Sequence, residues 1–157
     1  WIPSIVELGE LRLYDSGQPG LAVQLFQRAL ELDPQNSKIQ EKLATALASL
    51  GRSGEAIELY GKILEKDPLN VYAIDEIVAL YCTGKYFDEA EYVNQRFFQL
   101  HPNSHKPFYH QAVIQLSKQD TVRALDYLQN AIEITDQDEM VNALYSKLQP
   151  GANVKVQ

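Results

Sequence analysis

The chain contains few of the residues that hold small folds together through covalent or metal links. There is one cysteine, Cys82, and there are three histidines among 157 residues. A single cysteine excludes an internal disulfide framework, and a chain of this length buries enough surface to fold without one. No apolar run approaches the roughly 20 residues that span a membrane. Basic residues are outnumbered, 14 to 21, and the net charge of −7 argues against nucleic-acid and membrane-surface roles.

The sequence motifs of common enzyme sites are also missing. The sequence contains no HExxH, GxGxxG, phosphate-loop or CxxC pattern, so we predict neither catalysis nor a bound cofactor. The histidines cluster at His101, His105 and His110, but these positions straddle a proline-containing turn, and the three imidazoles need not converge. We therefore predict no metal site, and the alternative of metal binding by this cluster stays open.

What the sequence does contain is a repeat. The segments LAVQLFQRALELDP, EAIELYGKILEKDP, EAEYVNQRFFQLHP and RALDYLQNAIEITD follow one another at a period of 34 residues. This period predicts repeats over about 3–36, 37–70, 71–104 and 105–138, followed by a remainder at 139–157. The positions that mark the period are Ala22, Ala56, Ala90 and Ala124, and Pro34, Pro68 and Pro102.

Each repeat is expected to hold two helices. Apolar residues recur at spacings of three and four, as in Leu43, Leu47 and Leu50, which is typical of amphipathic helices. A further helix is predicted from Asp138 to Leu148, ended by Pro150 and Gly151, with Met140, Val141, Leu144 and Leu148 facing inward. The predicted paired helices lie near 4–16, 20–32, 37–50, 53–66, 71–83, 87–100, 105–118 and 121–134.

The repeat resembles the tetratricopeptide repeat (TPR) family. The second-helix pattern of that family, A-x3-F-x2-A-x4-P, is matched by Ala22, Phe26, Ala29 and Pro34. The third repeat departs from it, with Asn94 in the aromatic position. The first-helix pattern is degenerate, and in the first repeat its positions fall on Val6, Gly9, Glu10 and Leu13.

The resemblance implies an all-α, right-handed superhelical solenoid of four helix-turn-helix hairpins with a C-terminal capping helix. Residues 1–157 would then form a single array whose concave groove is made by the first helices. Stripes along those helices mix tyrosines, short apolar side chains and charges, which suits a peptide or a partner helix. The predicted groove residues are Leu8, Leu11, Tyr14, Lys42, Thr45, Tyr72, Glu76, Ala79, Tyr109, His110 and Val113.

The function predicted from these features is a non-catalytic scaffold for protein–protein interaction. The alternative is a targeting or regulatory TPR segment of a larger enzyme or of an envelope-assembly or secretion protein, an idea prompted by Trp1 at the start in place of Met. Apolar residues around more than one face of the first helix, including Ile2 and Ile5, favour further repeats upstream or self-association through the N-terminal hairpin. We expect a soluble protein, and the sequence leaves the cytoplasm and the periplasm equally open.

Overall fold

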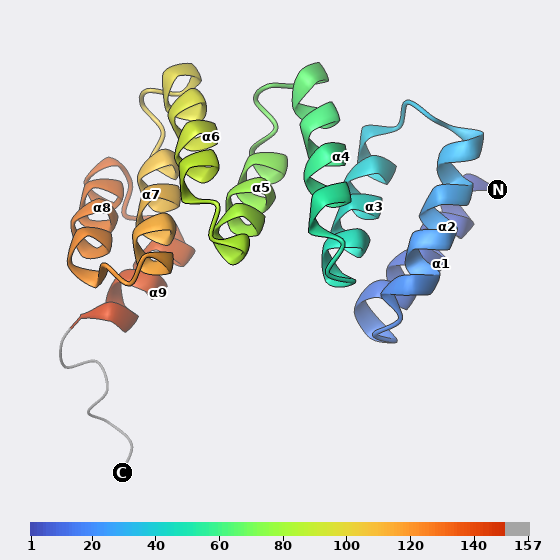
Figure 1. Ribbon diagram of the computed structural model, residues 1–157, viewed down its shortest axis with the longest axis horizontal. Coiled ribbons are helices and arrows are strands. Elements are labelled where there is room, and N and C mark those ends of the chain that lie inside the picture. The colour runs from blue at the N-terminus through green and yellow to red at the C-terminus, as the bar shows by residue number, and fades with distance from the viewer. Residues whose placement is uncertain (150–157) are drawn as a thin grey trace, which may run out of the picture. The chain divides into compact units, whose positions relative to one another are not determined.

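The computed structural model describes residues 1–149, and within them all regular structure is helical (Figure 1). The predicted all-α class is confirmed. Two compact units divide the chain, the first ending at Glu76 and the second beginning at Ile77, inside one helix. The predicted end of the last helix at Pro150 and Gly151, and the tail after it, lie outside the described residues. The helices are α1 (Ile2–Glu10), its continuation η1 (Leu11–Asp15), α2 (Pro19–Leu32), α3 (Ser37–Ser49), α4 (Ser53–Lys66), α5 (Val71–Gly84), α6 (Phe87–Leu100), α7 (Lys106–Ser117), α8 (Thr121–Ile134) and α9 (Glu139–Leu148).

The start of each first helix after the first repeat is fixed by a polar side chain at one recurring position. Asn36 Oδ1 accepts a hydrogen bond from the Ile39 N–H (3.2 Å), and Asn70 Oδ1 accepts one from the Ala73 N–H (2.9 Å). Such caps satisfy N–H groups that have no partner inside the helix. The 34-residue period of this position runs through Asn36, Asn70, Ser104 and Asp138, so α9 begins in phase with the repeats.

The turn inside each repeat places one residue in the left-handed backbone region. That position recurs every 34 residues, at Gly17 (φ 59°), Gly51 (φ 75°), Lys85 (φ 62°) and Gln119 (φ 66°). In the last three repeats the next residue closes the turn with a hydrogen bond to a carbonyl five residues back, as in Arg52 N–H to Leu47 O (2.9 Å). Glycine adopts this conformation without steric strain because it has no Cβ atom. Lys85 and Gln119 adopt it too, but their Cβ atoms make it unfavourable.

Replacing Lys85 or Gln119 with glycine is therefore expected to stabilise the protein. The left-handed conformation costs a non-glycine residue roughly 1–2 kcal/mol. Glycine loses more conformational entropy on folding, which offsets part of this gain. The expected increase in the free energy of unfolding is therefore about 0.5–1 kcal/mol for each substitution. Both side chains are exposed, so little packing is lost. Urea unfolding measures the difference. Gly51→Ala is the opposite change at the same turn position and should destabilise by a similar amount, and a stability gain for Gly51→Ala would contradict the argument.

The core of each hairpin is built from the small and large residues of its second helix. Ala22, Ala56, Ala90 and Ala124 are fully buried, and this lets the two helices approach closely. Phe26 and Tyr60 are also fully buried and fill the space beside the alanines in the first two repeats.

The first hairpin differs from the predicted pattern by one residue. Gly9 is buried against Phe26: a Cβ atom on Gly9 would lie 2.5 Å from the Phe26 ring. Gly9 is therefore the small packing residue that corresponds to Ala44 in the second repeat. Gly9 lies thirteen residues before Ala22, whereas Ala44 lies twelve residues before Ala56. The assignment of Gly9 and Glu10 to pattern positions in strict 34-residue register was therefore wrong by one residue.

A widened turn absorbs the additional residue. Over η1 the backbone hydrogen bonds span more residues than in an α-helix, from Ser16 N–H to Leu11 O (3.0 Å) and from Gln18 N–H to Arg12 O (2.7 Å). Because of this additional residue, the side chains of α1 are rotated about the helix axis relative to their positions in strict register. Glu10, which strict register assigns to a packing position, is directed instead toward Lys42 on α3.

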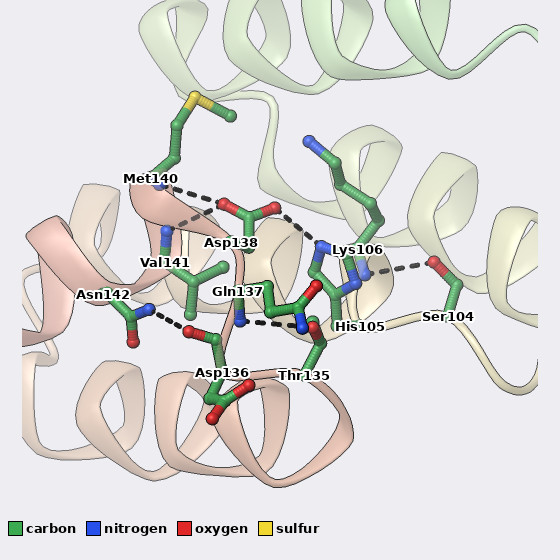
Figure 2. Close-up of polar contacts among 10 residues, drawn as sticks. All are labelled: Ser104, His105, Lys106, Thr135, Asp136, Gln137, Asp138, Met140, Val141 and Asn142. Atoms are coloured by element: carbon green, nitrogen blue, oxygen red, sulfur yellow. Dashed lines mark hydrogen bonds and ion pairs between the residues drawn. The ribbon is translucent and has the colours of Figure 1, made fainter.

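Helix α9 completes the core of the second unit. Val141 is 1% exposed and belongs to the buried cluster of Ala112, Ala124, Leu128 and Ala131, and Leu144 and Leu148 pack against it. The inward orientation predicted for Met140 is wrong, because that side chain is 52% exposed and points away from Val141 (Figure 2). Tyr145 packs against the cluster instead. A helix of three turns has one buried stripe, and Val141, Leu144, Tyr145 and Leu148 form it.

One carboxylate joins the start of α9 to the start of α7. Asp138 Oδ1 accepts hydrogen bonds from the N–H groups of Met140 (2.9 Å) and Val141 (3.1 Å), and its Oδ2 lies 2.7 Å from His105 Nε2 (Figure 2). Partial burial on its own would raise the pKa of Asp138. The Val141 N–H together with the neighbouring His105 and Lys106 outweighs that effect, and the pKa lies below its ordinary value of 3.8.

This lowered pKa predicts how acid weakens the docking of α9. Since Asp138 binds its proton less readily in the folded chain, its contribution to stability is complete above about pH 4 and is lost as the pH falls through the folded pKa. Asp138→Asn should be less stable at neutral pH, and it should lose less melting temperature than the parent between about pH 5 and about pH 3. Asp136→Asn, an exposed neighbour, should follow the parent. Identical pH profiles for the parent and Asp138→Asn would contradict this role.

Candidate functional site

The first unit has a pocket of about 240 Å³ on the surface made by its first helices. Three neighbouring positions of α3 supply one wall, η1 supplies a second and the first turn of α5 a third. The lining residues are Tyr14, Glu41, Lys42, Thr45 and Tyr72.

Local folding explains why these side chains meet. Glu41, Lys42 and Thr45 share one face of α3 because residues four apart lie on the same side of a helix. Tyr14 enters from the widened turn of η1, and Tyr72 comes one residue after the start of α5. The two tyrosines remain available to solvent, with 62% of Tyr14 and 42% of Tyr72 exposed.

Three hydroxyl groups are linked at the pocket: those of Thr45 and Tyr72, which line it, and that of Tyr60, which does not. The Thr45 hydroxyl lies 2.9 Å from that of Tyr60 and 2.8 Å from that of Tyr72, and the rings of Tyr60 and Tyr72 meet edge to face at 6.2 Å. Burial raises the pKa of Tyr60, so its hydroxyl stays protonated and keeps this hydrogen bond at any working pH. Tyr72 is thereby held in place while much of its ring stays exposed.

Carboxylates outnumber cations around the pocket. Lys42 is paired with Glu10, and Asn70 Nδ2 donates a hydrogen bond to Glu41 Oε1 (2.7 Å). Glu76 is half-buried, and desolvation together with the adjacent Asp75 raises its pKa, against the lowering effect of a hydrogen bond from Tyr72. The pocket therefore combines two aromatic rings with an excess of negative charge.

The remaining groove residues predicted from the sequence do not line this pocket. Leu8 and Leu11 are 40% and 46% exposed on the first helix, and they leave apolar surface on that hairpin. Self-association through it stays a prediction. Ala79 is exposed in the second unit, where Tyr109 and Val113 are half-buried. Tyr109 packs against the buried cluster of that unit, so part of its role is structural.

His110 does not offer its side chain to a groove, which corrects the prediction for that residue. It is 2% exposed, its Nδ1 lies 3.2 Å from Asn94 Oδ1, and its ring is 5.8 Å from that of Phe97. The physical reason is the shorter side chain at position 94. Where Phe26 and Tyr60 fill the earlier hairpins, Asn94 leaves room that the His110 ring occupies.

His101 shares an aromatic neighbour with His110, because its ring lies 4.8 Å from that of Phe97. His105 is hydrogen-bonded to Asp138 instead. Across residues 1–149 no three His, Cys, Asp or Glu side chains are grouped so that they could hold a metal ion.

Three contributors to the pocket are absent from the predicted groove residues. Glu41 lines the pocket, and Glu10 and Asn70 contact the lining residues Lys42 and Glu41. The sequence analysis assigned Glu10 to a position of the first-helix packing pattern. The thirteen-residue interval between Gly9 and Ala22 is the signal from which the position of Glu10 could have been found. No comparable signal in the sequence points to the contact between Asn70 and Glu41.

The second unit has a cleft of its own, of about 300 Å³. It opens between α6 and α8, with α7 contributing the third wall. At 100° per residue, the α7 positions that line it lie on the opposite side of that helix from Tyr109 and Val113. Its lining residues are Glu91, Asn94, Gln95, Phe98, Pro107, Phe108, Gln111 and Tyr127.

Comparison with known proteins decides the family. A family profile described as tetratricopeptide repeat matches residues 13–75, which include the pocket of the first unit up to Tyr72. Solved TPR structures cover almost the whole chain. The chain contains tetratricopeptide repeats and has the fold of the solved tetratricopeptide repeat proteins. Its predicted fold class, a TPR solenoid, is likewise confirmed, and the family is in general a non-catalytic protein-interaction fold.

Three solved structures illustrate the likeness of this TPR protein. A thermophilic TPR protein of Thermus thermophilus, TTC0263, superimposes with a TM-score of 0.71 at 19% identity, over 94% of this chain and 81% of that one. MamA of Desulfovibrio magneticus gives 0.69 at 15% identity, over 94% and 82%. The pilF protein of Pseudomonas aeruginosa gives 0.69 at 21% identity, over 94% and 67%.

At these identities the likeness establishes the fold, not the partner. No curated protein sequence gives a significant match to the chain. None of the helices that the structure describes has the length and apolar character needed to cross a membrane.

Proposed function

We propose that this TPR protein is a scaffold that binds a polypeptide partner through the first-helix surface of its first unit. The observation that supports this most directly is the pocket itself. Tyr14 and Tyr72 are largely exposed there, and the Tyr72 hydroxyl is hydrogen-bonded to that of Thr45. Exposed aromatic side chains supply binding energy at low entropic cost, and they are enriched at the energetic centres of interfaces.

The bound segment would be an extended peptide or the side of a helix. One side chain of the partner enters the pocket, and its neighbours contact the exposed apolar groups nearby. Leu8 and Leu11 on the first helix are candidates for such contacts. In the second unit, Ala79, Tyr109 and Val113 remain candidates for a contact of their own, and His110 is left out.

Selection of short random peptides on the immobilised protein, followed by calorimetry, tests the proposal. Tyr14→Ala should weaken the selected peptides by about tenfold or more with no change in melting temperature, because the side chain is largely exposed. Tyr92→Ala is the matched control, since Tyr92 is 61% exposed on α6 of the second unit and does not line the pocket. Failure to select any peptide, or equal affinity of the two variants, would contradict binding at this surface.

A further inference from the structure

We infer that the pocket of the first unit receives a lysine or arginine side chain of the partner, an inference that rests on the function proposed above. The occupant is thus a basic segment of polypeptide, recognised by one cationic side chain that lies between Tyr14 and Tyr72 with its charged end toward carboxylates. Charge and aromatic geometry each lead to a cationic side chain, and size limits the occupant of the pocket to one side chain.

The first argument is charge. The charged residues that line the pocket are Glu41 and Lys42, and Lys42 is already paired with the carboxylate of Glu10. A further carboxylate, that of Glu76, acts electrostatically on Tyr14 in the pocket wall. An incoming carboxylate would meet like charge, whereas an incoming ammonium or guanidinium group would offset it.

Glu76 is the group that gains most from such a partner. Its side chain is half-buried next to Asp75, so it has lost part of its hydration beside a like charge. The same conditions raise its pKa. A cation in the pocket would offer this carboxylate an opposite charge at a place where water screens the interaction only partly.

The second argument is the position of the tyrosines. Tyr14, Lys42 and Tyr72 line the same pocket. Burial raises the pKa of Tyr14, and the charges of Glu10 and Glu76 raise it further. Ring faces attract cations, and the attraction grows as the cation loses water. The long apolar stem of lysine or arginine packs on the rings while its charged end reaches a carboxylate.

The third argument is size. A volume of about 240 Å³ is below the roughly 300–1,000 Å³ of pockets that enclose drug-sized molecules. One long side chain fills it and a helix does not. The remainder of the partner therefore stays outside and runs over the neighbouring surface.

Nuclear magnetic resonance with the full chain tests this inference. The probes are three capped Gly/Ser peptides of equal length that carry one central arginine, norleucine or glutamate. The arginine peptide alone should shift the amide signals of Thr45 and Tyr72, and its affinity should fall several-fold when sodium chloride is raised from about 50 to about 300 mM. Glu76→Gln should also weaken it several-fold, whereas Glu31→Gln, an exposed residue of α2, should not.

The other outcomes separate this inference from the function on which it rests. If norleucine matches arginine, or if Glu76→Gln binds as the parent does, the cationic assignment is overturned and peptide binding at the pocket stands. The cationic assignment is also overturned, and peptide binding stands, if peptides selected from the random library need Tyr14 but the arginine peptide does not shift the amide signals of Thr45 and Tyr72. If no peptide of either kind shifts these amides, both fall, and shifts at Phe98 and Phe108 would move the site to the cleft of the second unit.

Discussion

Gly9→Leu is expected to disrupt the first hairpin and to lower the free energy of unfolding of the first unit by about 3 kcal/mol or more. A Cβ atom at position 9 would lie 2.5 Å from Phe26 Cε1, and Phe26 is fully buried, so its ring has no room to move aside. The added side chain must then push α1 away from α2. Urea unfolding followed by circular dichroism measures the loss.

The matched control is Gly61→Leu. Gly61 lies in the middle of α4, and a Cβ atom there meets nothing within 4 Å. Leucine is the better helix former by roughly 0.5–1 kcal/mol, so this variant should be as stable as the parent or more so. If Gly9→Leu were equally stable, the close packing of Gly9 on Phe26 and the one-residue shift of the first helix would both be wrong.

Val141→Asp is expected to release α9 from the second unit at a cost of about 3 kcal/mol. The substitution buries a carboxylate among the apolar side chains of Ala112, Leu128 and Ala131. We expect α9 to undock while α7 and α8 stay folded, which limits the loss to the docking free energy of that helix. Faster amide exchange in α9 and α8, together with a lower melting temperature, would show the release.

Met140→Asp provides the comparison at the adjacent position. Met140 is 52% exposed, and an acidic residue in the first turn of a helix is favourable, so this variant should keep the stability of the parent within about 0.5 kcal/mol. Equal losses for the two variants would mean that α9 does not present one face to the core.

Helix positions in this protein follow from local sequence. The predicted ranges agree with the structure to within two residues, because spacings of three and four and the breaks between them are properties of short segments. The recurrence of Asn36, Asn70, Ser104 and Asp138 is equally local, since a cap acts on N–H groups only two or three residues away.

The side-chain environments were less predictable. Met140 and Val141 are neighbours on one helix and both are apolar, so only the surface that α9 meets decides which of them is buried. His110 became part of the core because Asn94, sixteen residues earlier, is too short to fill its own position. Each outcome depends on a residue from another helix, and a pattern read along one helix does not contain it.

The sequence by itself therefore determined the helices, their pairing into repeats and the resemblance to the TPR family, because 34-residue periodicity fixes which segments are equivalent. The tertiary structure decided which of the predicted groove residues meet in the candidate site and which residues join them. One additional residue between Gly9 and Ala22 leaves the apolar pattern almost unchanged, yet the widened turn that absorbs it directs Glu10 toward Lys42. Packing against Phe26 selects that register, since glycine is the residue that fits beneath the ring.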